Sequence, residues 1–157
     1  MSETPQYTRL DVCVRFVASV RHSTELGIEV LSAEEMKVAA RMPWQERLIG
    51  NPETGALHGG AVFAFLDQVG GLAVACRTYP TFEITPTIDF RLDHLRAAEP
   101  GKSIIGIGEC YRFTEHVAFV KVSAFEEGSE DPVAVGLATY TRLKVPARGY
   151  FKEKKSA

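Results

Sequence analysis

The chain has 157 residues, of which 45% are hydrophobic and 24% charged, and its formal net charge is −2 at pH 7. This length suits one globular domain with a sizeable core, and the small charge argues against binding to nucleic acid or to an anionic membrane. The three cysteines, Cys13, Cys76 and Cys110, form no CxxC motif and no cluster with histidine. We therefore expect buried thiols rather than disulfides or a metal site. No basic segment leads into an apolar run near the N-terminus, so we expect a cytoplasmic protein without a signal peptide.

The first predicted element is an amphipathic helix over residues 5–22. Its apolar stripe is predicted to consist of Leu10, Val14, Val17 and Val20. After Gly27, residues 28–44 alternate loosely between apolar and polar side chains. This pattern predicts one strand, or two strands joined by a turn at SAEE.

The next element, residues 59–76, reads GGAVFAFLDQVGGLAVAC and is apolar on nearly all sides, which is typical of a helix buried in a core. We interpret it as too short and too polar to span a membrane. Four strand-like runs follow without another helix, at residues 84–95, 103–113, 116–125 and 133–145. The order predicts an α+β fold in which an antiparallel sheet surrounds one central helix. We divide the chain into an N-terminal helical segment (1–25), one domain (26–145) and a basic, flexible tail (146–157).

The start and the middle of the central helix carry unusual residues for an apolar segment. His58-Gly59-Gly60 stands at its start, where glycines let a ligand approach the backbone. The first N–H groups of a helix have no internal partner and favour a developing oxyanion. Asp67 lies among apolar neighbours, where a carboxylate is costly unless it is paired or used as a base or nucleophile. The structural alternatives are tight packing at the glycines and a buried hydrogen bond or ion pair at Asp67.

The spacing of these residues constrains any shared chemistry. Gly59 and Asp67 are eight residues apart, which is ~12 Å along one helix axis. An oxyanion donor and a base that act on one carbonyl must both lie within roughly 3 Å of the reacting atoms. One helix cannot supply both to the same substrate, but two antiparallel copies related by a two-fold axis can. A real site therefore predicts an obligate dimer with two equivalent sites.

The pattern Asn51…His58-Gly59-Gly60…Asp67, with the apolar helix and the strands after it, resembles the hotdog-fold acyl-CoA thioesterases over roughly residues 26–145. It is most similar to the phenylacetate-degradation type of the 4-hydroxybenzoyl-CoA thioesterase superfamily. The resemblance implies an antiparallel sheet around one long helix, and a dimer that often pairs again as a tetramer. It also implies hydrolysis of an acyl-CoA to the free acid and coenzyme A, without a separate cofactor.

The resemblance further implies roles for individual residues. The N–H of Gly59 would polarise the thioester carbonyl, and Asp67 would act across the dimer as nucleophile or general base. Asn51 would position the carbonyl or the attacking water. Thr87, in PTIDF, is the best match for the residue that holds the water near Asp67, and Thr85 is a weaker one.

An apolar tunnel beside the central helix is expected to take the acyl chain. The candidate substrate-binding residues are His58, Gly60, Phe63 and Leu66, with Phe65 as a further lining residue. For the three apolar side chains, plain core packing is the structural alternative. We interpret His58 as mainly structural, fixing the loop by hydrogen bonds, because Asp67 already supplies a base.

Two other functions stay open at this point. A hotdog hydratase or dehydratase would carry a DxNPxH-like motif before the helix, whereas Asp89 and His94 lie after it, so we interpret their spacing as chance. A non-catalytic acyl-CoA-binding module should lack the acid or carry a DNA-binding segment, yet Asp67 is present and no helix-turn-helix is evident. The sequence leaves open the acyl group, the choice between nucleophile and base, the basic residues that contact the coenzyme A phosphates, and dimer versus tetramer.

Overall fold

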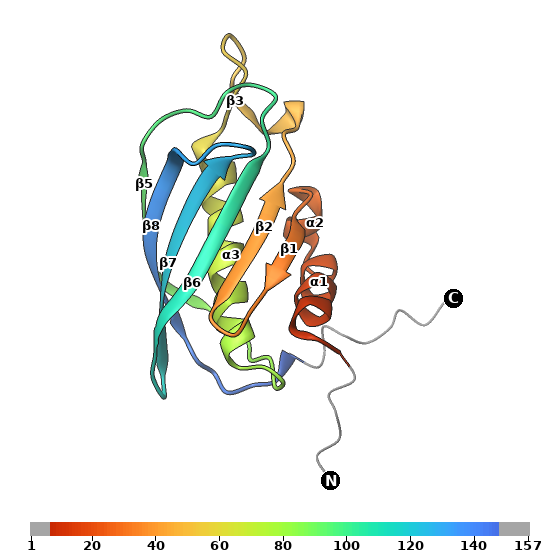
Figure 1. The fold of residues 1–157 in the computed structure, drawn as a ribbon, viewed down its shortest axis with the longest axis vertical. Helices are drawn as coiled ribbons and strands as arrows, with labels where there is room; N and C mark the ends of the chain where they lie inside the picture. The colour runs from red at the N-terminus through yellow and green to blue at the C-terminus, as the bar shows by residue number, and fades with distance from the viewer. Residues whose placement is uncertain (1–6, 148–157) are drawn as a thin grey trace, which may run out of the picture.

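The computed structural model describes residues 7–147 (Figure 1). Three α-helices lie in this range: α1 (Arg9–Ser19), α2 (Arg21–Glu25) and α3 (Gly59–Arg77). The strands are β1 (Glu29–Ala33), β2 (Lys37–Met42), β3 (Ile49–Asn51), β4 (Ala56–Leu57), β5 (Thr87–His94), β6 (Ile104–Phe113), β7 (Val117–Glu126) and β8 (Pro132–Thr141). A short 3-10 helix, η1 (Glu46–Leu48), precedes β3.

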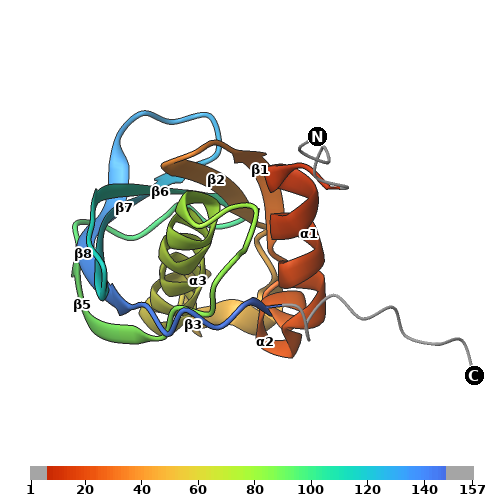
Figure 2. The same ribbon diagram turned by 90° about the horizontal axis from the view of Figure 1, so that it is seen from below.

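Six strands form one antiparallel sheet in the order β1-β2-β6-β7-β8-β5, and β3 pairs with β4 in a separate hairpin. Seen from the end in Figure 2, the sheet curves around α3, and α1 lies beside α3 next to β1. Alternate residues of a strand face the same side of its sheet. On β7 these are fully buried: Ala118, Val120, Val122 and Ala124. The predicted α+β fold, with an antiparallel sheet around one central helix, is confirmed.

The central helix packs closely against the sheet. Phe65, Leu66 and Val69 are fully buried. On β6, a Cβ at Gly106 would come within 2.7 Å of the Phe65 ring, and one at Gly108 within 2.9 Å of the Val69 carbonyl oxygen. These two glycines therefore set the short distance between helix and strand.

The length of α3 corrects one expectation. With 19 residues and a mean hydropathy of 1.5, α3 is long and apolar enough to cross a membrane, so the argument that it is too short and too polar is wrong. However, 56% of its apolar 18-residue stretch is buried inside the protein. That burial is typical of the core helix of a folded domain.

The predicted N-terminal helix is wrong in length and in its buried face. The described part of segment 5–22 is interrupted at Val20, whose backbone is extended, so that it forms α1 and α2; residues 5 and 6 lie outside the described range. The buried residues of α1 are Val12, Cys13 and Val17, whereas Leu10 and Val14 of the predicted stripe are exposed. Helix α1 contains more than one apolar stripe. The stripe around Cys13 is the buried one, because Cys13 packs against Cys76 of α3.

The strand predictions are mostly confirmed, with two shorter strands than expected. Segment 28–44 forms β1 and β2, and the turn falls within SAEE as predicted. The run 84–95 begins as a strand only at Thr87, and a bulge between Thr87 and Asp89 breaks its alternation. Ile88 is consequently 57% exposed instead of sharing a buried face with Phe90. The run 133–145 leaves the sheet after Thr141.

Candidate active site

The loop before α3 fixes the start of the helix. His58 is the N-cap residue, and its Nδ1 accepts a hydrogen bond of 2.9 Å from the Gly60 N–H. The His58 N–H donates to the Leu48 carbonyl oxygen at 2.8 Å. A Cβ at Gly50 would lie 2.8 Å from the His58 Cα, so the hairpin strand passes directly over this residue. His58 therefore caps the helix, and its Nδ1 is occupied in that role.

Gly59 is the first residue of α3, and its N–H has no acceptor among residues 7–147. It borders a cavity of about 280 Å³ whose other lining residues are Leu57, Val62, His94, Leu95, Arg96, Ala97, Ala98 and Val133. The His94 ring lies against Gly59, since a Cβ on Gly59 would be 3.4 Å from His94 Cε1. The free N–H thus lies at the wall of a cavity, as an oxyanion donor must.

Asp67 lies half-buried in the middle of α3. Its carboxylate accepts a hydrogen bond from a neighbouring hydroxyl group. The Thr87 hydroxyl donates to Asp67 Oδ1 at 2.7 Å. The Tyr140 hydroxyl lies 2.8 Å from the Asp67 carbonyl oxygen and 3.4 Å from Oδ1. Burial and the nearby Asp67 carboxylate raise the pKa of Tyr140 above its ordinary value, so its phenol stays protonated and serves as a donor.

A second cavity, of about 170 Å³, opens beside Asp67. Its polar wall consists of Asp67, Gln68, Glu83, Thr85, Thr87 and Tyr140, and its remaining lining residues are Phe16, Gly71, Ala75, Phe82, Ile84 and Pro86. It shares no lining residue with the cavity at Gly59. Gly59 and Asp67 therefore belong to separate cavities of the one chain, as their spacing on the helix predicts.

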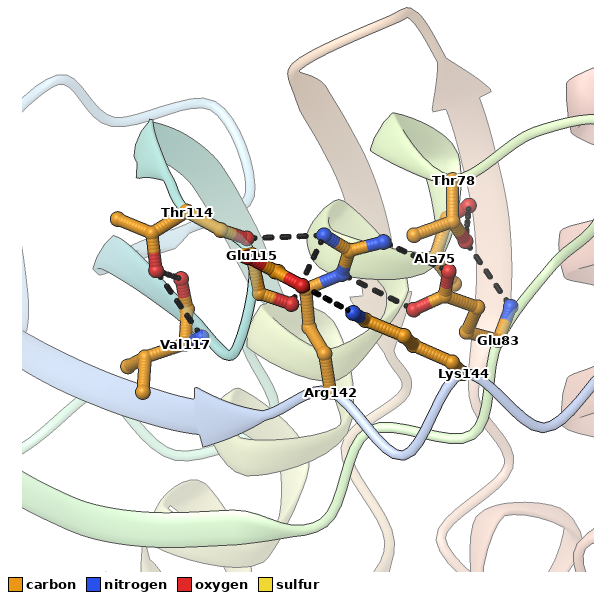
Figure 3. Close-up of polar contacts among 8 residues, drawn as sticks. All are labelled: Ala75, Thr78, Glu83, Thr114, Glu115, Val117, Arg142 and Lys144. Carbon is orange, nitrogen blue, oxygen red and sulfur yellow. Dashed lines mark hydrogen bonds and ion pairs between the residues drawn. The ribbon is translucent and has the colours of Figure 1, made fainter.

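A largely buried ion pair holds the loop that leads from α3 to Thr87 (Figure 3). Two nitrogens of Arg142 contact the Glu83 carboxylate at 3.0 and 2.7 Å, and a third nitrogen donates to the Thr114 carbonyl oxygen at 2.8 Å. The side chains of Arg142 and Glu83 are only 15% and 9% exposed. Because Glu83 lies four residues before Thr87 and also lines the Asp67 cavity, this pair ties the cavity wall to the sheet.

The other predicted site residues lie elsewhere. Asn51 is exposed in the β3–β4 hairpin, and its Oδ1 accepts the Glu53 N–H at 3.0 Å, so the fold of the single chain does not bring it to Asp67. Phe63 is 39% exposed and contacts the Phe90 ring at 4.4 Å between centroids. Leu66 is fully buried and lines neither cavity, which is the core packing named as its alternative.

Two neighbours of the site escaped the sequence analysis. Tyr140 carries no local signal, because its contact with Asp67 joins residues 73 positions apart. His94 was attributed to a chance spacing, but its place at the end of β5 brings it to Gly59. The position of β5 in the sheet and the direction in which it runs together place His94 near the start of α3, but the sequence alone does not give that position. Within the described part of the chain, no group of three or more His, Cys, Asp or Glu could hold a metal ion.

The family model of the thioesterase superfamily matches residues 54–133. The chain belongs to the thioesterase superfamily. A protein of Pseudomonas aeruginosa with a solved crystal structure is 37% identical to this chain, with a TM-score of 0.78; the match covers 87% of this chain and all (100%) of the other. The matched family segment contains α3, β5 and Asp67 but not α1 or α2.

More distant solved structures show the same fold. PaaI of the E. coli phenylacetic acid degradation operon is 16% identical with a TM-score of 0.71, over 79% of this chain and 85% of its own. A Streptococcus mutans protein, crystallised with acetyl-CoA, is 20% identical with a TM-score of 0.65, over 73% of this chain and 87% of its own. The predicted resemblance to hotdog-fold thioesterases is thus confirmed, and the fold is shared with PaaI.

Proposed function

We propose that this protein is an acyl-CoA thioesterase, which hydrolyses a coenzyme A thioester to a free acid and coenzyme A. The observation that carries the proposal is the Asp67 carboxylate, which faces a cavity and accepts a 2.7 Å hydrogen bond from Thr87. The free Gly59 N–H supports it as the oxyanion donor. Membership of the thioesterase superfamily, and acetyl-CoA bound to the Streptococcus mutans protein of the same fold, support the substrate class.

The arrangement of donors around Asp67 leaves one carboxylate oxygen for chemistry. Thr87 and Tyr140 both approach Oδ1, and no donor from residues 7–147 contacts Oδ2. Acting as a general base, Oδ2 takes a proton from water while the water oxygen bonds to the thioester carbon. The oxyanion forms at the Gly59 N–H. Its collapse breaks the C–S bond, and the proton passes from Asp67 to the departing thiolate.

Direct attack by Oδ2 on the thioester carbon is the alternative use of the same geometry. It would release the thiolate first and leave a mixed anhydride on Asp67, which water then hydrolyses. In ¹⁸O-water, single-turnover hydrolysis through the anhydride places label in the Asp67 carboxylate when water attacks the aspartyl carbon. General-base catalysis labels only the released acid.

A two-fold dimer completes this site, because the two cavities of one protomer are separate. The two outer strands of the sheet, β1 and β5, each have a strand partner on one side only; α1 packs beside β1, whereas β5 lies on the side of the sheet away from α1 (Figure 2). Exposed apolar side chains accompany this free edge: Ile88 on β5 is 57% exposed, and Phe63 on α3 is 39% exposed. We propose that two copies pair along β5 and α3, so that Gly59 of one copy faces Asp67 of the other.

Purified protein offered a panel of acyl-CoAs, with free thiol as the readout, tests the proposal. Asp67→Asn should lower kcat by about 100- to 10,000-fold, as expected on removal of a general base. Glu109→Gln, at an exposed acid on β6 outside the Asp67 cavity and away from the proposed β5 interface, serves as the matched control and should keep wild-type turnover. Retained turnover in Asp67→Asn would refute the assignment. Tight binding of acyl-CoA without thiol release would instead favour the non-catalytic binding module.

A further inference from the structure

We propose that Phe16, on the N-terminal helix α1, is a specificity-determining residue that closes the acyl cavity beside Asp67 and limits the acyl group to about one six-membered ring or six carbons. The inference rests on the proposed thioesterase function and assigns the size of its acyl group. It goes beyond the family match, because Phe16 lies outside residues 54–133.

The cavity follows one face of the central helix. Its lining residues on α3 are Asp67, Gln68, Gly71 and Ala75. From Asp67 to Ala75 is eight residues, or ~12 Å along the axis. The carboxylate therefore lies at one end of the cavity, and the end at Ala75 is where the acyl group must terminate.

Three contacts fix the N-terminal segment against this face of α3. Cys13 Sγ lies 3.5 Å from Cys76 Sγ, and the Arg9 Nε donates to the Cys76 carbonyl oxygen at 3.1 Å. The Ser23 hydroxyl, on α2, donates to Gln68 Oε1 at 3.0 Å.

The segment consequently runs antiparallel to α3, with residue 13 near residue 76 and residue 23 near residue 68. Phe16 lies about one turn after Cys13, which places its side chain at the Ala75 end of the cavity.

A second aromatic ring completes the closed end. Phe82 contacts Phe16 with ring centroids 5.6 Å apart, and Phe82 is only 2% exposed. Its φ of 52° is a conformation that bulky L-residues rarely adopt. Hydrogen bonds hold it there, from the Phe82 N–H to the Thr78 carbonyl oxygen at 3.3 Å and from the Ala147 N–H to the Phe82 carbonyl oxygen at 2.8 Å. The wall opposite Asp67 is therefore aromatic and firmly placed.

The volume sets the size of the acyl group. The cavity measures about 170 Å³, and an apolar cavity of about 150 Å³ is known to hold one benzene molecule. One ring, or a chain with a similar number of carbons, therefore fills the space between Asp67 and Phe16. A longer chain would have to displace the ring of Phe16.

A series of straight-chain acyl-CoAs from two to sixteen carbons, assayed by thiol release, tests the inference. Wild-type kcat/KM should fall at least ten-fold between six and ten carbons. Phe16→Ala should raise the ratio of kcat/KM for ten carbons to that for six by at least ten-fold, since one methylene in an apolar pocket is worth about 10-fold or more. Phe16→Trp should move the optimum to shorter chains. Val14→Ala, at a 46% exposed position of the same helix, should leave the profile unchanged.

The outcomes separate this inference from the proposed function. An unchanged ratio in the folded Phe16 variants, or an equal loss at every chain length, would overturn the role of Phe16 while leaving the thioesterase intact. If Phe16→Ala does not fold, Phe16→Leu and Phe16→Trp provide the same comparison. Absence of thiol release by the wild-type protein across the whole series would overturn the proposed function, and the inference with it.

Discussion

Replacing Gly59 by proline removes the N–H that would bind the thioester oxygen and puts a ring carbon in the place of its hydrogen. The position tolerates proline, because the first residue of a helix donates no internal hydrogen bond and its φ suits the proline ring. The preceding residue, His58, has the extended backbone (φ −63°, ψ 130°) that proline requires of its neighbour. The variant should therefore fold and retain helix α3.

The expected loss follows from the strength of one oxyanion donor. Removal of such a donor costs about 100- to 1,000-fold in kcat, or about 2.7–4 kcal/mol of transition-state stabilisation. Gly59→Ala is the matched control, since alanine keeps the N–H and its Cβ would meet His94 at an ordinary 3.4 Å. Steady-state thiol release from one good acyl-CoA, with circular dichroism to verify the fold, measures both variants. If folded Gly59→Pro retains kcat within ten-fold of Gly59→Ala, the N–H is not the oxyanion donor.

Three further changes test the surroundings of Asp67 and the packing of the core. Thr87→Val should lower kcat by about 10- to 100-fold, the worth of one hydrogen bond to a charged group, whereas Thr87→Ser should keep most of the activity; equal rates would contradict the assigned donor. Glu83→Gln leaves Arg142 buried without its charge partner and should lower the free energy of unfolding by about 3 kcal/mol in urea titrations. Glu115→Gln, at an exposed ion pair, should change the free energy of unfolding little. Similar losses of stability in Glu83→Gln and Glu115→Gln would show that burial of the ion pair does not matter. Burial raises the pKa of the Cys110 thiol from 9.0 to about 11. The folded state therefore holds the proton of this thiol more tightly than the unfolded state, and the stability that this adds is complete below pH 9 and is lost as the pH rises through 11. Cys110→Ala should therefore show a smaller fall in stability over that range than the wild-type protein.

The central helix and the candidate residues on it could be named from the sequence because their signals are local. The apolar run and the glycines define the start of α3, and the rise of a helix separates Gly59 from Asp67 without any knowledge of the sheet. Thr87 was found from a short motif, although the bulge beside it, which exposes Ile88, leaves no trace in the residue alternation. Long-range packing decides the rest. Tyr140 reaches Asp67 only because β8 lies against β5 in the folded sheet.

The N-terminal helix shows a second limit of sequence reasoning. Its apolar residues fit more than one stripe, and the sequence does not say which stripe contacts the domain. The structure selects Val12, Cys13 and Val17 because Cys13 packs against Cys76 of α3. The same contact brings Phe16 to the cavity beside Asp67, so an ambiguity in the helix face hid the residue that we propose limits the acyl group.

The most direct test of the shared site is complementation between two inactive variants. Heterodimers of Gly59→Pro with Asp67→Asn, purified through two different tags, contain one intact site if each site draws Gly59 and Asp67 from different chains. These heterodimers should regain about half of the wild-type kcat per dimer, because one of the two equivalent sites is complete. Heterodimers of wild type with the double variant should be inactive. The reverse result, with activity only in the second heterodimer, would contradict a site formed across the dimer.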